Sequence, residues 1–345
     1  MIRDCDIRHM VGILMFIVIS LHGIARCDDD YAAAFLDIGI GARALGMGGA
    51  YTSLADDGTA FYWNPAGLGF IDKTSLTGMY GPQFGLFDNP LGQFHFLGLA
   101  QPLPMGAVIS VNWIRLSVDD IPVYSDLAGG SYWDRLHNMS LRPSGEPEGY
   151  IQDKEDALFF SFSRMNRLQL DLGWGYYDVG IDIPFGVNFK WIRQTLGDAE
   201  GSGLGVDVGA MVRFHLDDFI QNENLGLLSW GIVFQDMTGT KLSWSTKHRD
   251  TLDRNVKWGV SYTQPIPAIK GNVRLAYDHA SRWGGFHSFG AELEGFGVFA
   301  LRAGVQDGRF TTGAGLRFWN LTVDYAFQSH ELDALHRISC ALSLF

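Results

Sequence analysis

The stretch "NVKWGVSYT", residues 255–263, alternates apolar and polar side chains without a break. One phase carries four bulky apolar residues: Val256, Trp258, Val260 and Tyr262. The other phase carries small or polar residues, with Lys257 as its only charge. Because successive side chains of a strand point to opposite faces, the stretch predicts a β-strand with one apolar and one polar face.

The same alternation returns in four other parts of the chain. It is found in "FGVNFKW" (185–191), "LLSWGIVFQ" (227–235), "NVRLAYD" (272–278) and "LTVDYAF" (321–327). Two architectures explain such repeats. A soluble sandwich turns its apolar faces inward against a second sheet, whereas a membrane barrel turns them outward to lipid and its polar faces to the lumen.

Two features of the strand faces favour the barrel. The apolar faces are bulky and aromatic, as expected for a wall in lipid with aromatic girdles. The polar faces combine small residues with isolated charges of both signs, which suits a lumenal network. Eight charged residues fall in the polar phase and are predicted to face the lumen: Lys190, Lys257, Arg274, Asp278, Glu292, Arg302, Arg317 and Asp324.

The C-terminus is a third feature, and it carries a flaw. The chain ends in an aromatic residue, Phe345, as outer-membrane barrels commonly do. The apolar phase of the preceding residues is one position out of step with it: Ile338, Cys340, Leu342 and Leu344. A β-bulge near the end would restore the register.

From residue 73 onward the chain contains about fifteen strand-like runs, the weakest near residues 73–80 and 168–178. Bacterial single-chain barrels have an even number of strands, so fourteen is predicted. Residues 118–154 lack alternation and are predicted to form one long extracellular loop. The predicted fold class is therefore all-β, a transmembrane antiparallel β-barrel over residues 73–345.

Residues 1–27 have the features of a signal peptide. Arg3 and Arg8 precede the apolar run "MVGILMFIVISL", residues 10–21, and small residues follow it at Gly23 and Ala25. The run is shorter than the roughly 20 residues that a membrane-spanning helix needs. An exported protein is therefore predicted, with a buried N-terminal helix as the alternative.

Composition excludes several classes of function. The chain has a net charge of −12 and no run of Lys or Arg, which argues against nucleic-acid binding. Two of its 3 cysteines lie within residues 1–27, which leaves neither a disulfide framework nor a Cys-rich metal site. No cofactor and no metal are predicted.

The most unusual stretch is "GARALGMGGAYTSLADDGTAFYWNPAGL", residues 41–68. Its glycines lack the spacing of a nucleotide-binding loop, and no Gly-Lys-Ser/Thr follows. The adjacent carboxylates Asp56 and Asp57 cannot flank a scissile bond as a hydrolytic pair does. His279 and Ser281 could share a strand face, but the sequence identifies no third member of a catalytic triad. No enzymatic activity is predicted.

A packed plug explains this stretch better than a reactive loop. Gly46, Gly48 and Gly49 allow the backbone to approach neighbouring segments closely. The stretch also precedes the first convincing strand. Residues 28–72 are therefore predicted to form an N-terminal hatch, or plug, inside the barrel.

The second half of the stretch predicts a short capped turn within this plug. Asp56 or Asp57 is expected to cap a helical turn that carries the aromatic residues 61–63. Pro65 is expected to end that turn, because it lacks an N–H donor and restricts the backbone of Asn64.

Residues 41–68 closely resemble the N-terminal signature of PorV/PorQ-type outer-membrane proteins, which belong to the superfamily of the long-chain fatty-acid transporter FadL. "VDDIP" (118–122) and "HRIS" (336–339) are similar to later landmarks of that group, and "NPAGL" (64–68) resembles part of the FadL hatch. The resemblance implies a barrel in the bacterial outer membrane whose lumen is closed by a hatch.

The resemblance leaves two functions open, and a structural barrel or small-solute porin is a third reading. Likeness to PorV implies a role in type IX secretion, with exported cargo and secretion-complex proteins as partners. "SYWDRLHNM" (131–139), with Tyr132 and Trp133, is then a candidate docking loop, or else a simple covering loop. Likeness to FadL instead implies passive transport of hydrophobic molecules, which would bind within the lumen.

Overall fold

The computed structural model describes residues 32–86, 89–127, 131–141, 145–171, 178–220, 225–330 and 334–344. The predicted signal peptide, residues 28–31 of the predicted hatch and Phe345 lie outside these ranges. Among the described residues, no helix is long and apolar enough to cross a membrane.

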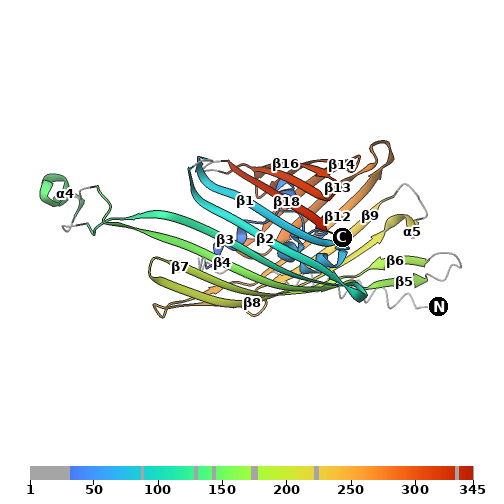
Figure 1. Ribbon diagram of the computed structural model, residues 1–345, viewed down its shortest axis with the longest axis horizontal. Helices are drawn as coiled ribbons and strands as arrows, with labels where there is room; N and C mark the ends of the chain where they lie inside the picture. Colours follow the sequence, from blue (N-terminus) through green and yellow to red (C-terminus); the bar gives the residue numbers. More distant parts are fainter. Residues whose placement is uncertain are drawn as a thin grey trace. The chain divides into compact units, whose positions relative to one another are not determined.

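The described residues form a closed ring of fourteen antiparallel strands, which confirms the predicted fold class and strand number (Figure 1). In order around the ring, the strands are β1 (Thr74–Leu86), β2 (Asn89–Leu103), β3 (Ala107–Val123), β4 (Gly149–Arg164), β7 (Phe185–Leu196), β8 (Ala199–His215), β9 (Leu227–Gln235), β12 (Asn255–Ile266), β13 (Gly271–Ala280), β14 (Phe286–Gly295), β15 (Phe299–Gln306), β16 (Arg309–Phe318), β17 (Leu321–Gln328) and β18 (Leu335–Leu344). Closure removes every free sheet edge from the wall, and this rules out the sandwich alternative.

The first and last strands close the ring. β1 pairs with β18 from Thr74 opposite Leu344 to Tyr80 opposite Ile338, with no shift of register. The apolar phase of β18 therefore continues to Leu344 without the bulge considered above, while its polar phase turns Arg337 and Ser339 inward to buried positions.

Four strands lie outside the ring as two hairpins. β5 (Arg167–Asp171) pairs with β6 (Asp178–Asp182), and β10 (Thr240–Trp244) pairs with β11 (Arg249–Leu252). β6 and β10 each extend the pairing of β8 beyond its ring neighbours. The weak run near residues 168–178 therefore belongs to an accessory hairpin, whereas the run near 73–80 is the beginning of β1.

The predicted loop 118–154 is shorter than expected, because β3 continues to Val123 and β4 already begins at Gly149. The two strands pair beyond the point where their other neighbours end, and they project from the ring as a two-stranded arm (Figure 1). Both faces of such an arm are open to solvent, so no alternation marks it in the sequence. Near its tip lie α4 (Tyr132–His137) and the 3-10 helix η4 (Met139–Leu141).

Short turns join the other strands. They include α5 (Leu216–Ile220) and the 3-10 helices η3 (Pro104–Gly106), η5 (Pro267–Ile269) and η6 (Arg282–Gly284). The elements before β1 are η1 (Ala34–Asp37), α2 (Ala42–Gly46), α3 (Ala60–Trp63) and η2 (Pro65–Phe70). We call residues 32–73 the plug.

The plug lies within the ring and reaches two opposite parts of it. α2 packs against β15, β16, β17 and β18, and η2 packs against β3, β4, β7 and β8. The largest fully buried side chains of the molecule include the plug residues Phe35, Tyr51 and Phe61. The hydrophobic core therefore consists of the plug and the inward-facing strand residues packed on it, such as Phe94 and Ile114, whereas the outward apolar faces of the strands are exposed, as at Leu204, Phe189 and Leu275.

Candidate functional site

The side chain of Asn64 joins the plug to the wall. Asn64 is fully buried, and its Nδ2 donates to the carbonyl oxygens of Thr52 at 3.0 Å, Ala210 on β8 at 3.2 Å and Ile232 on β9 at 3.4 Å. Its Oδ1 accepts a bond from the amide of Ala66 at 3.1 Å. One amide group therefore satisfies backbone atoms of the plug and of two strands in a place that water does not reach.

Asn64 and Pro65 also shape the backbone locally. α3 ends at Trp63, and Asn64 adopts an extended conformation as the N-cap of η2, with Pro65 at the first helical position. Proline is favoured there because its missing N–H would have no helical partner. The structure thus places Pro65 at the start of a second turn, directly after the turn that it was expected to end.

Glycines of the wall admit this part of the plug. A Cβ at Gly209 would lie 2.1 Å from Asn64 Oδ1, and one at Gly186 would lie 2.3 Å from the carbonyl carbon of Pro65. Ser163 on β4 completes the contact by donating to the carbonyl of Ala66 at 3.0 Å. We call this surface, on β4 and β7–β9, the neutral wall, because its hydrogen bonds to the plug, among the described residues, involve uncharged groups. A charged side chain of this wall, Arg213, contacts the plug through the Phe70 ring, 3.7 Å from its centre.

The three glycines singled out in the sequence lie against the opposite wall. Gly46 ends α2 at close range to Gly313 on β16. Gly48 and Gly49 have positive φ angles of 66° and 72°, a region that other residues rarely adopt. A Cβ at Gly48 would also meet the backbone of Val305 at 2.9 Å, so this position requires glycine for both conformation and space.

Asp56 and Asp57 organise the centre of the plug. Asp57 accepts bonds from the Thr59 amide at 2.8 Å and from the Tyr51 hydroxyl at 2.6 Å, just before α3 begins. Asp56 forms a 2.7 Å ion pair with Arg43. Burial opposes ionisation of Asp56, but the guanidinium of Arg43 outweighs it, and the pKa of this carboxyl falls below its usual value.

A network of charged residues ties Arg43 to the wall. Arg43 makes two bonds to Glu292 on β14, from Nε at 3.0 Å and from Nη2 at 3.1 Å. Glu292 also binds Arg274 Nη1 and Arg302 Nε, each at 2.6 Å. Burial disfavours the charged form of Arg43, but Asp56 and Glu292 outweigh it and raise its pKa well above the usual value.

The network continues along the strands beyond Glu292. Arg302 binds Asp324 at 2.6 Å, and Arg274 binds Glu294 at 2.7 Å. Arg317 lies 3.5 Å from Glu294, and its side chain is half exposed at the edge of the network. Five of the eight charges predicted to face the lumen thus meet in this one cluster: Arg274, Glu292, Arg302, Arg317 and Asp324.

A second charged cluster lies around Lys190. Its ammonium group binds Asp207 and Asp236, each at 2.8 Å. Asp236 also binds Arg282 at 2.7 Å, and Arg282 reaches Asp37 of the plug at 3.1 Å. Asp207, Asp236 and Arg282 were not among the sequence candidates. Asp236 and Arg282 follow the ends of β9 and β13, where alternation gives no information, but Asp207 lies within β8, where the alternation of its neighbours would have marked it.

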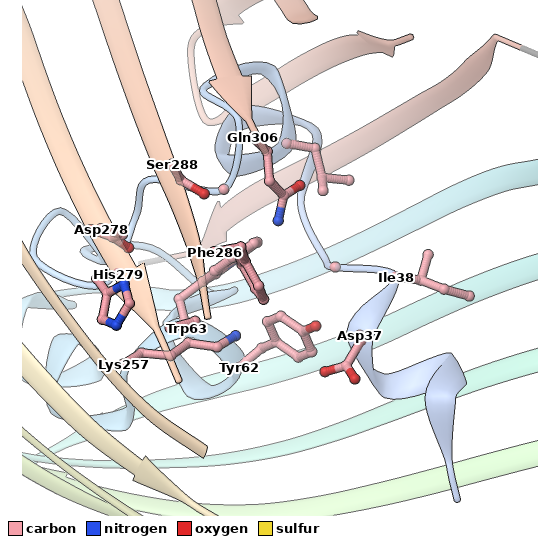
Figure 2. Close-up of a pocket in the computed structure, with 14 residues that line it drawn as sticks. Asp37, Ile38, Tyr62, Trp63, Lys257, Asp278, His279, Phe286, Ser288 and Gln306 are labelled. Carbon is pink, nitrogen blue, oxygen red and sulfur yellow. The ribbon is translucent and has the colours of Figure 1, made fainter. Parts of the chain in front are cut away.

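Asp278 and Lys257 meet the plug in different ways. Asp278 Oδ2 accepts bonds from the amides of Tyr51 at 2.9 Å and Thr52 at 2.7 Å. Lys257 is buried, and among the described residues it has no carboxylate partner within ion-pair distance. Its ammonium lies 5.6 Å from the ring centres of Tyr62 and Trp63, toward which it points in Figure 2.

These residues surround a small pocket, which we call the outer pocket (Figure 2). Its volume is about 30 Å³, which suits one water molecule. The plug contributes Asp37, Leu45 and Trp63 among others, and the wall contributes residues such as Phe286 and Gln306.

A larger cavity, the inner chamber, lies along the charged network. Its volume is about 480 Å³. It is lined by Arg43, Asp56 and Asp57 of the plug, by the charged side chains around Glu292, and by residues at the ends of β14–β18 and the start of β1. The surface that carries Glu292, Asp278 and the contacts of α2, on β13–β18, is called the charged wall below.

Of the remaining sequence candidates, Tyr132 and Trp133 lie apart from the lumen, whereas His279 lines the outer pocket. Tyr132 and Trp133 are 64% and 65% exposed on α4, near the tip of the arm. His279 and Ser281 do not form a dyad: Ser281 Oγ accepts a bond from the Val256 amide at 2.8 Å, and the His279 ring lies 4.8 Å from the ring of His287.

A closed barrel of fourteen strands around a plug held by both walls defines the class of the protein, a plugged β-barrel. The fold is similar to that of the Pseudomonas putida toluene transporter TodX, with a TM-score of 0.52 and 11% identity over 88% of this chain and 97% of TodX. A TodX mutant described as a monoaromatic hydrocarbon channel gives 0.50 and 12% over 88% of this chain and 98% of that one. No known protein family and no curated protein matches the sequence. The likeness shows a barrel fold shared with TodX, and the resemblance to FadL and to PorV/PorQ-type proteins stays a prediction.

Proposed function

We propose that this protein is a passive transporter of hydrophobic molecules in the bacterial outer membrane, and that it acts without catalysis. The observation that carries the proposal is a lumen blocked by a plug with one cavity on each side, so that movement of the plug would open a path. The fold shared with TodX, a toluene transporter, supports the same conclusion.

The outer face of the barrel supports the proposed location. Large apolar side chains on the ring strands are exposed, and aromatic residues cluster at the turns, where Phe318 and Trp319 are 66% and 87% exposed. Apolar bands edged by aromatic side chains are typical of barrels in lipid.

Uptake measurements test the proposal. The full-length protein is produced in a Gram-negative host that lacks its own hydrocarbon and fatty-acid channels, and uptake of labelled toluene and of labelled oleate is followed. We expect uptake of at least one probe to rise above that of cells with an empty vector. Uptake equal to the vector control for both probes, with the barrel present in the outer membrane, would overturn the proposal.

Secretion-linked binding is a second candidate, favoured by one observation. The arm carries an exposed aromatic helix at its tip, with Tyr132 and Trp133 open to solvent. Exposed aromatic side chains are frequent anchors in protein interfaces. Specific co-purification of exported proteins with the wild-type barrel, lost in the double variant Tyr132→Ala and Trp133→Ala, would favour this candidate over transport.

A further inference from the structure

The outer pocket and the inner chamber border the same strands of the barrel. β13, β14 and β15 each contribute residues to both: Asp278 and Arg274 on β13, Ser288 and Glu292 on β14, and Gln306 and Arg302 on β15. All barrel residues that line either cavity, among those described, belong to β1, to β12–β18 or to the turns between them. Both cavities therefore lie along the charged wall and the strands beside it, β12 and β1.

Two plug segments separate these cavities: residues 39–49, and residues 59–63, of which Thr59 lines the inner chamber and Tyr62 and Trp63 line the outer pocket. Within the segment of residues 39–49, Gly39 and Leu45 line the outer pocket, whereas Gly41 and Arg43 line the inner chamber. On the wall, Ser288 and Glu292 are four residues apart on one strand, a separation of about 13 Å. Displacement of this segment, which contains α2, would join the two cavities into one path.

The contacts of the other half of the plug differ. Residues 59–70 border the neutral wall, where Asn188 donates to the carbonyl of Phe61 at 2.7 Å and Gln235 donates to that of Tyr62 at 3.1 Å. Neither cavity is lined by residues of the neutral wall. Of this half, Tyr62 and Trp63 line the outer pocket and Thr59 and Phe70 line the inner chamber. Both cavities therefore border residues 59–70 on the side turned away from the neutral wall, and neither lies between these residues and that wall.

We propose that α2 with its flanking glycines, residues 39–49, is the gate of the transport path, and that residues 59–70 remain anchored on the neutral wall when it opens. The inference rests on the proposed function and names the moving part and the route. Hydrophobic molecules pass along β13–β15, behind the displaced α2, from the outer pocket to the inner chamber.

Arg43 is the latch of this gate. It binds the wall through Glu292 and the plug centre through Asp56, so α2 cannot leave the wall while both bonds persist. When Arg43 withdraws, Glu292 keeps Arg274 and Arg302 within 2.6 Å and is not left as an unpaired buried charge. The wall therefore tolerates release of the latch, whereas a buried carboxylate with a single partner would not.

Two matched disulfide tethers test which half moves. Ala42 of α2 and Ser339 of β18 form one pair, with the Ala42 amide 3.1 Å from Ser339 Oγ. Ala66 of η2 and Ser163 of β4 form the control pair, with Ser163 Oγ 3.0 Å from the Ala66 carbonyl. Each pair is replaced by cysteines in a background where the native cysteines are serine, and uptake of toluene and oleate is compared in oxidised and reduced cells.

The proposed gate predicts that the first tether inhibits uptake and that the second leaves it nearly unchanged. Oxidation of the Ala42→Cys, Ser339→Cys variant should lower uptake by more than about tenfold, because a closed tether removes the open state, and reduction should restore it. Oxidation of the Ala66→Cys, Ser163→Cys variant should change uptake by less than about twofold. The reverse pattern, or equal inhibition by both tethers, would overturn the gate while leaving transport intact.

Hydrogen exchange tests the gate in the wild-type barrel without any ligand. Three amides that bond to backbone carbonyls of the plug are compared from each half: Leu45, Met47 and Gly49 near α2, and Tyr62, Asn64 and Gly67 near η2. The first group should exchange at least about tenfold faster, since local opening exposes it more often. Equal or slower exchange would overturn the gate. If uptake by the wild type fails, the proposed function falls, and this measurement still decides the gate.

The Arg43→Ala variant supplies a further check that needs no cysteine chemistry. Uptake should rise by about threefold or more, because the closed state loses its latch. The Ser163→Ala variant, which removes one neutral bond of the anchor, should stay near the wild-type rate. A larger rise for Ser163→Ala than for Arg43→Ala would contradict the assignment.

Discussion

The two walls of the barrel hold the plug by different chemistry. On the neutral wall, one buried amide, Asn64, serves four backbone groups, and glycines bring the backbones together. On the charged wall, Arg43 and Asp278 make charge-assisted bonds beside two cavities. Hydrogen bonds between uncharged groups in a fully packed contact have no alternative partners and keep the plug in place. Charged groups beside a cavity can replace a lost ion-pair partner by water or by a neighbouring charge.

Asn64→Ala should produce the largest effect, because it removes bonds to two carbonyls of the neutral wall and to two backbone groups of the plug at once. We expect a loss of about 3 kcal/mol in the stability of the docked plug, since each buried unsatisfied group costs about 1–3 kcal/mol. Release of small solutes from liposomes that contain the barrel should rise. Asn112→Ala is the control, because Asn112 is equally buried but bonds to Ser110 on its own strand. Unchanged permeability for Asn64→Ala would show that the anchor lies elsewhere.

Gly304→Ala and Gly231→Ala compare the packing of the two walls directly. A Cβ at Gly304 would lie 2.3 Å from the carbonyl carbon of Met47, and one at Gly231 would lie 2.4 Å from the carbonyl oxygen of Thr52. Overpacking of this kind costs about 1–3 kcal/mol, and thermal unfolding of the purified barrel should show it for both variants. Gly180→Ala on β6 meets no atom within 4 Å and should leave the transition unchanged. If only one of the two variants unfolded at a lower temperature, only the wall that carries that glycine would be tightly packed against the plug.

Acid should loosen the charged wall first. The pKa of Asp56 lies below its unfolded value, so its contribution to stability is complete above roughly pH 4 and is lost as the pH falls through the lower, folded pKa. Exchange of the α2 amides should therefore accelerate below about pH 4, relative to the η2 amides, and this acceleration should be absent in Asp56→Asn. If amide exchange in the Asp56→Asn variant depended on pH as it does in the wild type, Asp56 would not be the group responsible for the acceleration.

Lys257→Met should have the smallest effect. The side chain is buried and has no ion-pair partner within the described part of the chain, and its contacts with Tyr62 and Trp63 contribute about 0.5–2 kcal/mol as cation–π interactions. Methionine keeps the length of the side chain and its packing on the two rings. The loss of the cation–π attraction is therefore nearly offset by removal of the cost of burying a charge. We expect the free energy of unfolding to change by less than about 1 kcal/mol. A large loss would show that Lys257 has a role in the plug that the ring contacts do not explain.

Much of this architecture was accessible from the sequence, for a physical reason. Strands with one face in lipid and one on the lumen must alternate apolar and polar side chains. This alternation predicts the barrel strands and shows which residues, such as Glu292, face the lumen. The arm escaped that reasoning because both of its faces meet solvent. The partners of Arg43 or Asn64 could not be predicted, because they depend on the register between strands and on how the plug docks, neither of which a single segment encodes.

The closure of β1 on β18 has a consequence for folding kinetics. The plug precedes the first strand, yet its Ala42 amide bonds to Ser339 on the last. Such separations in sequence slow folding, because the whole wall must be made before its seam can form. The plug must therefore be enclosed before β1 pairs with β18. The order in which the strands assemble around it, and not its insertion into a finished barrel, then determines where the plug lies in the lumen.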